Sequence, residues 1–281
     1  MKKDPNQIGS HTAPMICGTS TNGNAHVVYQ MIHFPDLVPP VEGAIIDNGH
    51  LAEPFIMGRH NIKHPDRGVF AAAKTYERVI DDVPCRATPD GELEDGTAIL
   101  ECKMRFFRDR DFYGEEGSSD VMAQDYDQVQ WQMHVMGEHV QRAYLAVWFG
   151  IAQDITTFVI ERDQKRIDEM MAIIGNFWVF NVEAKIPPAD DESEACRKYH
   201  AHYASIAEKR REFTQDEWRD AKEWSELDAE IKRLDDEKKL IENRLRGAMG
   251  DHEELWADGT KTKVTFKTNK RGARPLRVYW K

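Results

Sequence analysis

The apolar residues of the chain follow two spacings, which predict where helices and strands lie. Apolar residues that recur every three or four positions indicate amphipathic helices, and this spacing occurs over residues 25–35, 49–58, 120–137 and 162–180. Shorter apolar runs indicate strands, and they occur over residues 69–73, 75–88, 98–104, 142–150 and 155–161. Helices and strands are therefore interspersed along this part of the chain.

Two tight turns shape the segment at residues 88–104, which reads TPDGELEDGTAILECKM. The EDGT at residues 94–97 predicts a hairpin turn into the run AILECKM, because Asp-Gly accepts the positive φ angles that such turns require. Asp90 and Gly91 predict a second sharp bend. The hairpin is thus expected to bring Asp90 near the far end of the run, where Glu101 lies.

The charges at the end of this run suggest a metal site. Side chains alternate along a strand, so Glu101 and Lys103 share one face and Cys102 takes the other. Two carboxylates, Asp90 and Glu101, suit Mg²⁺, which favours one or two carboxylates together with water and phosphate oxygens. Lys103 beside them would orient or deprotonate an attacking water. The alternative is an exposed Glu/Lys pair on a hairpin.

The last third of the chain carries a heptad seam, in which apolar residues alternate in steps of three and four. Its positions are Trp224, Leu227, Ile231, Leu234, Lys238, Ile241, Leu245 and Ala248. Such a stripe needs a partner helix, for which residues 193–213 are the candidate. Gly250 is predicted to end the long helix, and a basic, strand-like tail follows.

Composition marks the domain boundaries. Pro187 and Pro188, followed by the acidic run ADDESE, indicate a linker. We therefore predict a chemistry-bearing core over 1–186, a coiled-coil-like helical extension over 187–250 and a basic tail over 251–281.

Net charge and hydropathy set the broad class of protein. The 281 residues are 41% hydrophobic, enough for a sizeable core, and the formal net charge is -11. No run of 18 apolar residues and no signal-peptide core is present, so we expect no membrane association and a cytoplasmic location, in a bacterium or a phage-infected host cell. An acidic chain argues against nucleic acid as a partner, since phosphate contacts supply most of that affinity.

The charge of the C-terminal tail favours the opposite conclusion. From Thr260 onward it contains basic and aromatic residues and no acid. This mixture suits a polyanion with stackable bases. The candidate DNA-binding residues of the tail are Lys267, Lys270, Arg271 and Arg274. The alternative is a solvated tail that offsets the acidic remainder.

Other common sites find no support in the sequence. The four cysteines are far apart, with no C-x-x-C pair, and are interpreted as reduced and structural. The spacing of His50, His60 and His64 fits no zinc signature, so these are interpreted as loop histidines. Neither a P-loop nor G-x-G-x-x-G occurs, which disfavours a nucleotide-hydrolysing or dinucleotide-dependent enzyme.

Four motifs in order resemble one nuclease family. They are GHLAEP, CRATPDGELEDGTAILECK, DYDQVQWQM and TTFVIERDQ, and together they span roughly residues 7–185. Their order and spacing resemble the YqaJ-type phage recombination exonucleases, which are similar to lambda exonuclease and belong to the PD-(D/E)XK nuclease superfamily. The resemblance implies an α/β, restriction-endonuclease-like fold. A central mixed sheet holding the hairpin of residues 76–104 would be flanked by helices, with a C-terminal helical hairpin and the basic tail added.

The resemblance also implies roles for individual residues. Glu53 in GHLAEP would complete a Mg²⁺ or Mn²⁺ site with Asp90, Glu101 and the backbone carbonyl of Cys102. Lys103 would be the catalytic lysine. Gln128 would hold the attacking water or the scissile phosphate, although without the family it would be an ordinary helix-face glutamine. Tyr126 and Gln132 are adjacent supporting candidates, and Gln132 is also a candidate for DNA contact.

The chain departs from the family near its N-terminus. Relatives grip a DNA phosphate there with an arginine, whereas here QIGSHTAP is preceded only by Lys2 and Lys3. Ser10 and Thr12 would bind phosphate through their hydroxyls and the helix-end amides. A requirement for 5'-phosphorylated ends is therefore open.

The implied reaction is metal-dependent hydrolysis of double-stranded DNA ends, 5' to 3', in recombination by single-strand annealing. The implied partners are double-stranded DNA, a single-strand annealing protein and further copies of the chain in a ring. A ring would also explain DNA binding by an acidic chain, because basic groups would line the channel. The alternatives are a nicking or structure-specific endonuclease, and a DNA-binding recombination scaffold with weak nuclease activity.

Overall fold

The structure is a computed structural model that describes residues 7–39, 42–68, 70–150, 152, 154–203, 211–259, 262–268 and 275–280. The chain divides into two units, Met1–Ile206 and Ala207–Lys281. The domain limits predicted after residues 186 and 250 stay predictions.

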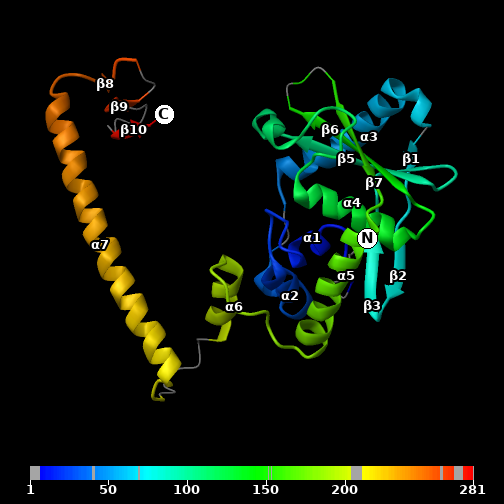
Figure 1. Ribbon diagram of the computed structural model, residues 1–281, viewed down its shortest axis with the longest axis horizontal. Coiled ribbons are helices and arrows are strands. Elements are labelled where there is room, and N and C mark those ends of the chain that lie inside the picture. The colour runs from blue at the N-terminus through cyan, green and yellow to red at the C-terminus, as the bar shows by residue number, and fades with distance from the viewer. Residues whose placement is uncertain are drawn as a thin grey trace. The chain divides into compact units, whose positions relative to one another are not determined.

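A mixed five-stranded sheet lies at the centre of the first unit (Figure 1). Its strands, in spatial order, are β1 (Phe70–Ala72), β4 (Gly91–Leu93), β5 (Ala98–Arg105), β6 (Arg142–Phe149) and β7 (Thr156–Glu161). β5 and β6 run parallel, and the other neighbours are antiparallel. The predicted EDGT turn joins β4 to β5, and Gly96 within it has a φ of +70°. The central mixed sheet is thus confirmed.

The hairpin of β2 (Tyr76–Ile80) and β3 (Val83–Ala87) does not join this sheet. We predicted one sheet holding residues 76–104, but these two strands form a separate two-stranded sheet, and Ile8 adds a parallel bridge to Cys85 of β3. Asp81 and Asp82 make the turn with φ angles of 48° and 64°. Aspartate tolerates this left-handed backbone better than most residues. A tight hairpin therefore forms here without the glycine that is common in such turns.

The alternation along β5 sends its side chains to two different cores. Ala98, Leu100 and Cys102 pack in a cluster with residues of α3 (Ala44–Lys63). Ile99 packs on the opposite face with Val129 of α4 (Ala123–Met136). α3 is therefore one layer and α4 the other. α3 is longer than the predicted 49–58.

α4 is buried on nearly all sides. Its opposite flank, with Trp131 and Val135, packs into a third cluster. This cluster includes residues of three more helices, α1 (Thr12–Ile16), α2 (Ala25–His33) and α5 (Gln164–Phe177). A wider helical turn, η4 (Trp178–Glu183), extends α5. The polar residues of α4 are therefore enclosed in the protein and need partners there.

α6 (Glu194–Tyr203) packs against α2 within the first unit (Figure 1). The ring of Tyr199 lies 5.8 Å from that of Tyr29 and 5.6 Å from that of Phe34, both edge-on. Residues 193–213 were predicted to pair with the long C-terminal helix. That pairing stays a prediction.

The second unit contains the predicted long helix, α7 (Gln215–Met249). Thr214 and Glu217 form a capping box at its start, and Gly250 follows its end with a φ of +51°. Seam residues such as Leu227 and Ile231 are exposed. β8 (Glu254–Trp256), β9 (Lys263–Thr265) and β10 (Arg277–Tyr279) form an antiparallel sheet. Within the described part of the chain, no helix is long and apolar enough to cross a membrane.

Candidate active site

Glu101 and Lys103 lie on the face of β5 that α4 covers. The Lys103 Nζ is 2.6 Å from Glu101 Oε1, and the two side chains are 12% and 4% exposed. The strand alternation therefore places the pair as predicted, with Cys102 in the core on the other face. Because both groups are buried, the pair is not the exposed Glu/Lys pair that we considered as an alternative.

Two glutamines of α4 hold the carboxylate of Glu101. Gln128 Nε2 donates to Oε1 at 2.5 Å, and Gln132 Nε2 donates to Oε2 at 2.8 Å. Lys103 also donates to Oε1 and to the amide oxygen of Gln128, at 2.9 Å for the latter. Oε1 thus accepts two hydrogen bonds and Oε2 accepts one. Since a carboxylate oxygen has two lone pairs, Oε2 retains capacity for one more partner.

Gln132 was a candidate both for support and for DNA contact. Its side chain is completely buried, and its amide is directed at Glu101. This placement favours a role in fixing the carboxylate over a contact with DNA.

The charges of the pair stabilise each other. Burial acts to raise the pKa of Glu101, but the charge of Lys103 and the hydrogen bond from Gln132 outweigh it, with a smaller effect of His11, and the pKa falls below its usual value. Burial acts to lower the pKa of Lys103, but the negative charges of Glu101 and Asp125 raise it above its usual value. Glu101 is therefore an anion and Lys103 a cation at neutral pH.

Asp90 approaches the same site from the bend before β4. Its Oδ2 accepts the backbone N–H of Cys102 at 2.7 Å, at a point beyond the last β4–β5 pair, Gly91 with Leu100. Burial and the charge of Glu101 raise the pKa of Asp90 to about 8. The carboxylate of Asp90 therefore lacks enough nearby positive charge to stay ionised easily.

Glu53 reaches this region from α3, on the other face of the sheet. It lies close enough that its charge contributes to the raised pKa of Asp90, after burial and Glu101. Its side chain is 35% exposed, and its Oε1 is 2.9 Å from the Nδ1 of His50, one helical turn earlier. His50 is thus a partner of a predicted ligand, not an isolated loop histidine.

The donor atoms of Glu53, Asp90 and Glu101 fit a hard divalent cation. All are carboxylate oxygens, the ligands that Mg²⁺ and Mn²⁺ prefer. A cation beside Asp90 would supply the positive charge that its raised pKa shows to be missing. Among the described residues, the three carboxylates do not form a group whose ligand atoms all lie within 4.8 Å of one another. A Mg²⁺ ion that retains several waters does not need such a closed cage.

A network of hydrogen-bonded side chains next to Lys103 was not predicted from the sequence. Arg105, two residues along β5, donates through Nη2 to Asp125 Oδ1 at 2.5 Å and through Nε to the Tyr113 hydroxyl at 3.0 Å. Tyr113 donates to the other oxygen of Asp125, also at 2.5 Å. Asp125 lies in the first turn of α4, so the network fixes this helix against β5.

A second network fixes α4 on its other flank. Arg166 of α5 donates through Nε and Nη2 to the two oxygens of Asp127, at 2.8 and 2.7 Å. The Thr19 hydroxyl donates to the same carboxylate at 2.6 Å. Bidentate pairs of this kind set orientation as well as energy. Both networks position the helix that carries Gln128 and Gln132.

Ser10 and Thr12 line a hollow of about 210 Å³ together with Arg86 of β3. Ser10 Oγ is buried and has no hydrogen-bond partner among the described residues. The amides of Thr12 and Ala13 are already bonded to the Gly9 carbonyl, each at 3.0 Å, so the predicted helix-end amides are not all available. Arg86 lines the hollow, and its Nη1 lies 3.9 Å from Glu77 Oε1. It was not predicted from the sequence, because it is 74 residues from Thr12 in the chain.

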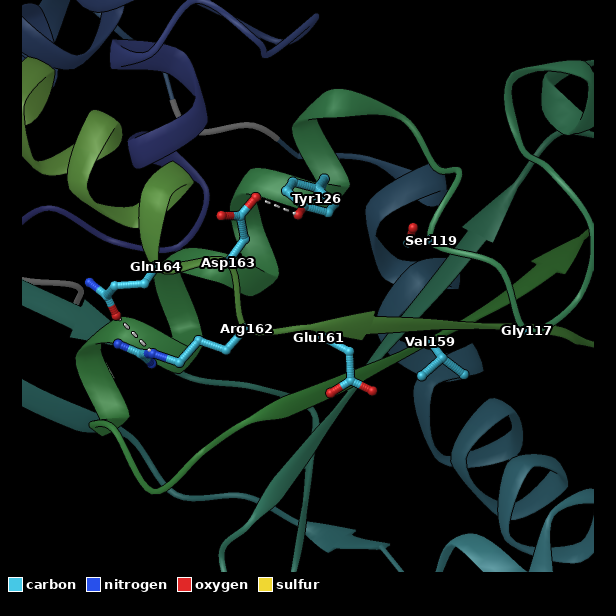
Figure 2. A pocket seen from close by; sticks show the side chains of 8 residues that line it. All are labelled: Gly117, Ser119, Tyr126, Val159, Glu161, Arg162, Asp163 and Gln164. Carbon is cyan, nitrogen blue, oxygen red and sulfur yellow. Dashed lines mark hydrogen bonds between the residues drawn. The ribbon is translucent and has the colours of Figure 1, made fainter.

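Tyr126 lines a different, open hollow of about 500 Å³ between α4 and the end of β7. Figure 2 shows its hydroxyl directed at Asp163, to which it donates at 3.1 Å. The glutamines that hold Glu101 do not line this hollow, which is built instead from Gly117, Ser119, Val159, Glu161, Arg162 and Gln164. Tyr126 therefore links α4 to Asp163, just beyond β7, and its hydroxyl is directed at Asp163 rather than at Glu101.

The basic tail residues fall in the second unit. Lys267 is exposed, with its Nζ 3.6 Å from Glu254. Lys270, Arg271 and Arg274 lie outside the described residues. The exposed Trp256 lies opposite Lys263 in the strand register, so cations and aromatic rings are both present on this sheet.

Solved structures with this fold include exonucleases. An alkaline exonuclease (LHK-Exo) from Laribacter hongkongensis covers 72% of this chain and 95% of its own at 14% identity, with a TM-score of 0.50. LHK-Exo in complex with dAMP gives a TM-score of 0.51 at the same identity and coverage. A phage-related exonuclease from Haemophilus somnus 129PT covers 64% of this chain and 96% of its own at 12% identity, with a TM-score of 0.45.

The likeness to LHK-Exo shows that this chain has the fold of a known exonuclease. It confirms the predicted α/β class and the predicted resemblance at the level of fold. No family model and no curated protein matches the chain.

Proposed function

We propose that the protein is a metal-dependent DNA exonuclease. The observation that carries the proposal is the meeting of Asp90, Glu101, Lys103 and Gln128 at one end of β5, with two carboxylates, one buried lysine and one amide. The exonuclease fold of LHK-Exo and the four sequence motifs support the same conclusion. The substrate would be the ends of double-stranded DNA.

The residues divide into those that hold a metal and those that act on water and phosphate. Glu53, Asp90, Glu101 and the Cys102 carbonyl would hold Mg²⁺ or Mn²⁺, which when bound polarises a phosphate oxygen and lowers the pKa of water. Lys103 remains charged beside Glu101 and stabilises the negative charge that develops on the phosphate during attack.

Gln128 and Lys103 act together on the attacking water. The amide oxygen of Gln128 already accepts from Lys103, and its nitrogen is fixed on Glu101. A water that approaches the lysine is therefore met by groups whose orientation is set before substrate binds, which lowers the entropic cost of the reaction. Gln132 keeps Glu101 in place from the opposite side.

We assign the end of the DNA to the hollow formed by Ser10, Thr12 and Arg86. A buried hydroxyl without a partner and a guanidinium suit a terminal phosphate. His11 also lines the hollow, and its charge contributes to the lowered pKa of Glu101. The proposed polarity, digestion from a 5'-phosphorylated end towards 3', comes from the sequence resemblance.

The wider assignment follows from the sequence resemblance. The product would be a single strand for an annealing partner protein in phage-type recombination, and several copies of the chain would form a ring around the duplex. A ring concentrates basic groups in its channel while the outer surface stays acidic, which reconciles DNA binding with a net charge of -11.

The test compares linear and closed circular DNA of one sequence, each incubated with the protein and Mg²⁺. An exonuclease degrades the linear form and leaves the circle intact. Glu101→Gln should lose this activity. Glu94→Gln is the matched control and should keep it, because Glu94 is exposed in the turn of the same hairpin. Cutting of the circle would refute the exonuclease and favour the endonuclease, and retention of both forms would favour the DNA-binding scaffold.

A further inference from the structure

A cluster of histidine, cysteine and aspartate lies outside the proposed active site, where α6 meets α2. His26 in the first turn of α2, Asp191 before α6 and Cys196 in α6 each offer one ligand atom, and these atoms lie within 4.8 Å of one another. His26 is 1% exposed and Cys196 is 4% exposed. Nitrogen, sulfur and oxygen ligands thus converge where the histidine and the cysteine are buried and the aspartate is exposed.

Two further groups adjoin Cys196. Asp190, Cys196 and His200 also have ligand atoms within 4.8 Å of one another. The Cys196 Sγ lies 3.6 Å from Asp190 Oδ1, and His200 Nε2 lies 2.8 Å from the same oxygen. Cys196 and His200 are four residues apart in one helix, so they project from the same side. This spacing is not C-x-x-C, and His26 is remote in sequence, which is why the sequence analysis interpreted Cys196 as structural.

The hydrogen bonds of His26 leave one ring nitrogen without a partner. Nε2 is 2.9 Å from the carbonyl oxygen of Ala189. A carbonyl only accepts, so Nε2 carries the proton and Nδ1 has the lone pair. Nδ1 is buried and has no hydrogen-bond partner among the described residues, an arrangement that costs free energy unless a ligand compensates. Metal-binding histidines commonly donate their other ring N–H to a backbone carbonyl in this way.

Asp191 is oriented by bonds of its own. Asn24 Nδ2 donates to Oδ2 at 2.7 Å, and the backbone N–H of Ser193 donates to Oδ1 at 3.0 Å. Each oxygen keeps a second lone pair. The carboxylate is therefore held in place and still able to bind.

We propose that His26, Asp191 and Cys196 bind one zinc-class divalent cation, with a water as the fourth ligand and with Asp190, hydrogen-bonded to His200, beside the site. Thiolate and imidazole select zinc over magnesium. On binding, the thiol of Cys196 loses its proton to solvent and its sulfur forms the bond to the metal.

The proposed site would fix α6 to α2 at the end of the first unit. The second unit begins at Ala207, a few residues beyond α6. A metal there would hold the last helix of the nuclease fold in place without taking part in hydrolysis. The site is independent of the proposed nuclease metal, whose ligands are all oxygens.

Cobalt titration of the full-length, metal-stripped protein tests the proposal, with a large excess of Mg²⁺ present to occupy the oxygen-only site. We expect one equivalent of Co²⁺ to produce a thiolate-to-cobalt charge-transfer band in the near ultraviolet, which one equivalent of Zn²⁺ then abolishes. Cys196→Ser should lose the band, and Cys17→Ser, the matched control, should keep it. Asp191→Asn should keep the band but weaken cobalt affinity at least about tenfold.

Thermal unfolding gives a second readout. Zinc should raise the unfolding midpoint of the wild-type protein and of Cys17→Ser, but not that of Cys196→Ser. The proposal is overturned if the wild type gives no charge-transfer band at one equivalent, or if Cys196→Ser retains it. Cobalt bound without that band would mean coordination by surface histidine and carboxylate only, and it would overturn the proposal as well.

Discussion

Replacing Asp90 with asparagine is expected to stabilise the metal-free protein while abolishing its activity. The pKa of Asp90 is raised from 3.8 to about 8 by burial and by the charge of Glu101. Lys103 lowers the pKa of Glu101, so the proton of the coupled pair resides on Asp90. Asparagine cannot ionise, and its side-chain oxygen can still accept the Cys102 amide.

The magnitude follows from proton linkage. Between pH 3.8 and about 8 the unfolded chain has released a proton that the folded chain retains. The folded state therefore binds more protons, and its stability falls by about 1.4 kcal/mol for each pH unit that the pH rises. The unfavourable contribution is absent below pH 3.8 and constant above about pH 8. Between about pH 6 and pH 8, the stability of Asp90→Asn relative to wild type should rise by about 2 kcal/mol.

Urea unfolding of both proteins in EDTA across this pH range measures the difference. Histidines that titrate in the same range are common to both proteins and cancel. Asp95→Asn is the matched control, because Asp95 is exposed in the same hairpin and its pKa is lowered by hydrogen bonds from Thr97. The stability of Asp95→Asn relative to wild type should not change with pH. Added Mg²⁺ should remove the slope of the wild type and leave Asp90→Asn unchanged. A pH-independent difference in EDTA would refute the reasoning.

Three other changes have expected outcomes. Lys103→Met leaves the buried Glu101 without its cation, so nuclease activity should be lost and urea unfolding should show a stability about 3 kcal/mol lower; unchanged stability would contradict the buried pair. Gln132→Leu removes the bond to Glu101 Oε2, and turnover should fall about 10- to 100-fold with DNA affinity unchanged, whereas a loss of affinity alone would show that Gln132 contacts DNA. Removal of residues 260–281 should weaken DNA binding and flatten its dependence on salt concentration in a fluorescence titration, and an identical slope would show that the tail does not contact phosphates.

The central sheet and the strand that carries Glu101 and Lys103 were predictable because their signals are local. The EDGT turn and the alternation of AILECKM fixed which side chains share a face, and the contact between Lys103 and Glu101 follows directly from that alternation. The hairpin of residues 76–87 was not predicted as a separate sheet. Its turn uses two aspartates with positive φ, and no glycine marks it.

The partners of α4 were not predictable for a different reason. Periodicity assigns the apolar residues of a helix to the core and leaves polar residues to solvent. α4 is enclosed by two cores, so Asp125, Asp127 and Gln132 are buried and bonded within the protein. Arg105, which bonds to Asp125, comes from β5, and Arg166, which bonds to Asp127, comes from α5. Contacts between segments that are far apart in the chain produce no periodic pattern in a single sequence.

The most direct test of the central claim is a time course of DNA digestion by the wild type and Glu101→Gln. Linear duplex DNA with 5' phosphates is labelled at either the 5' or the 3' ends and incubated with Mg²⁺. The wild type is expected to release the 5' label at once as a mononucleotide and the 3' label only late, with Glu101→Gln inactive and EDTA stopping the reaction. Equal digestion by Glu101→Gln, or digestion that continues in EDTA, would contradict a metal-dependent site at the end of β5.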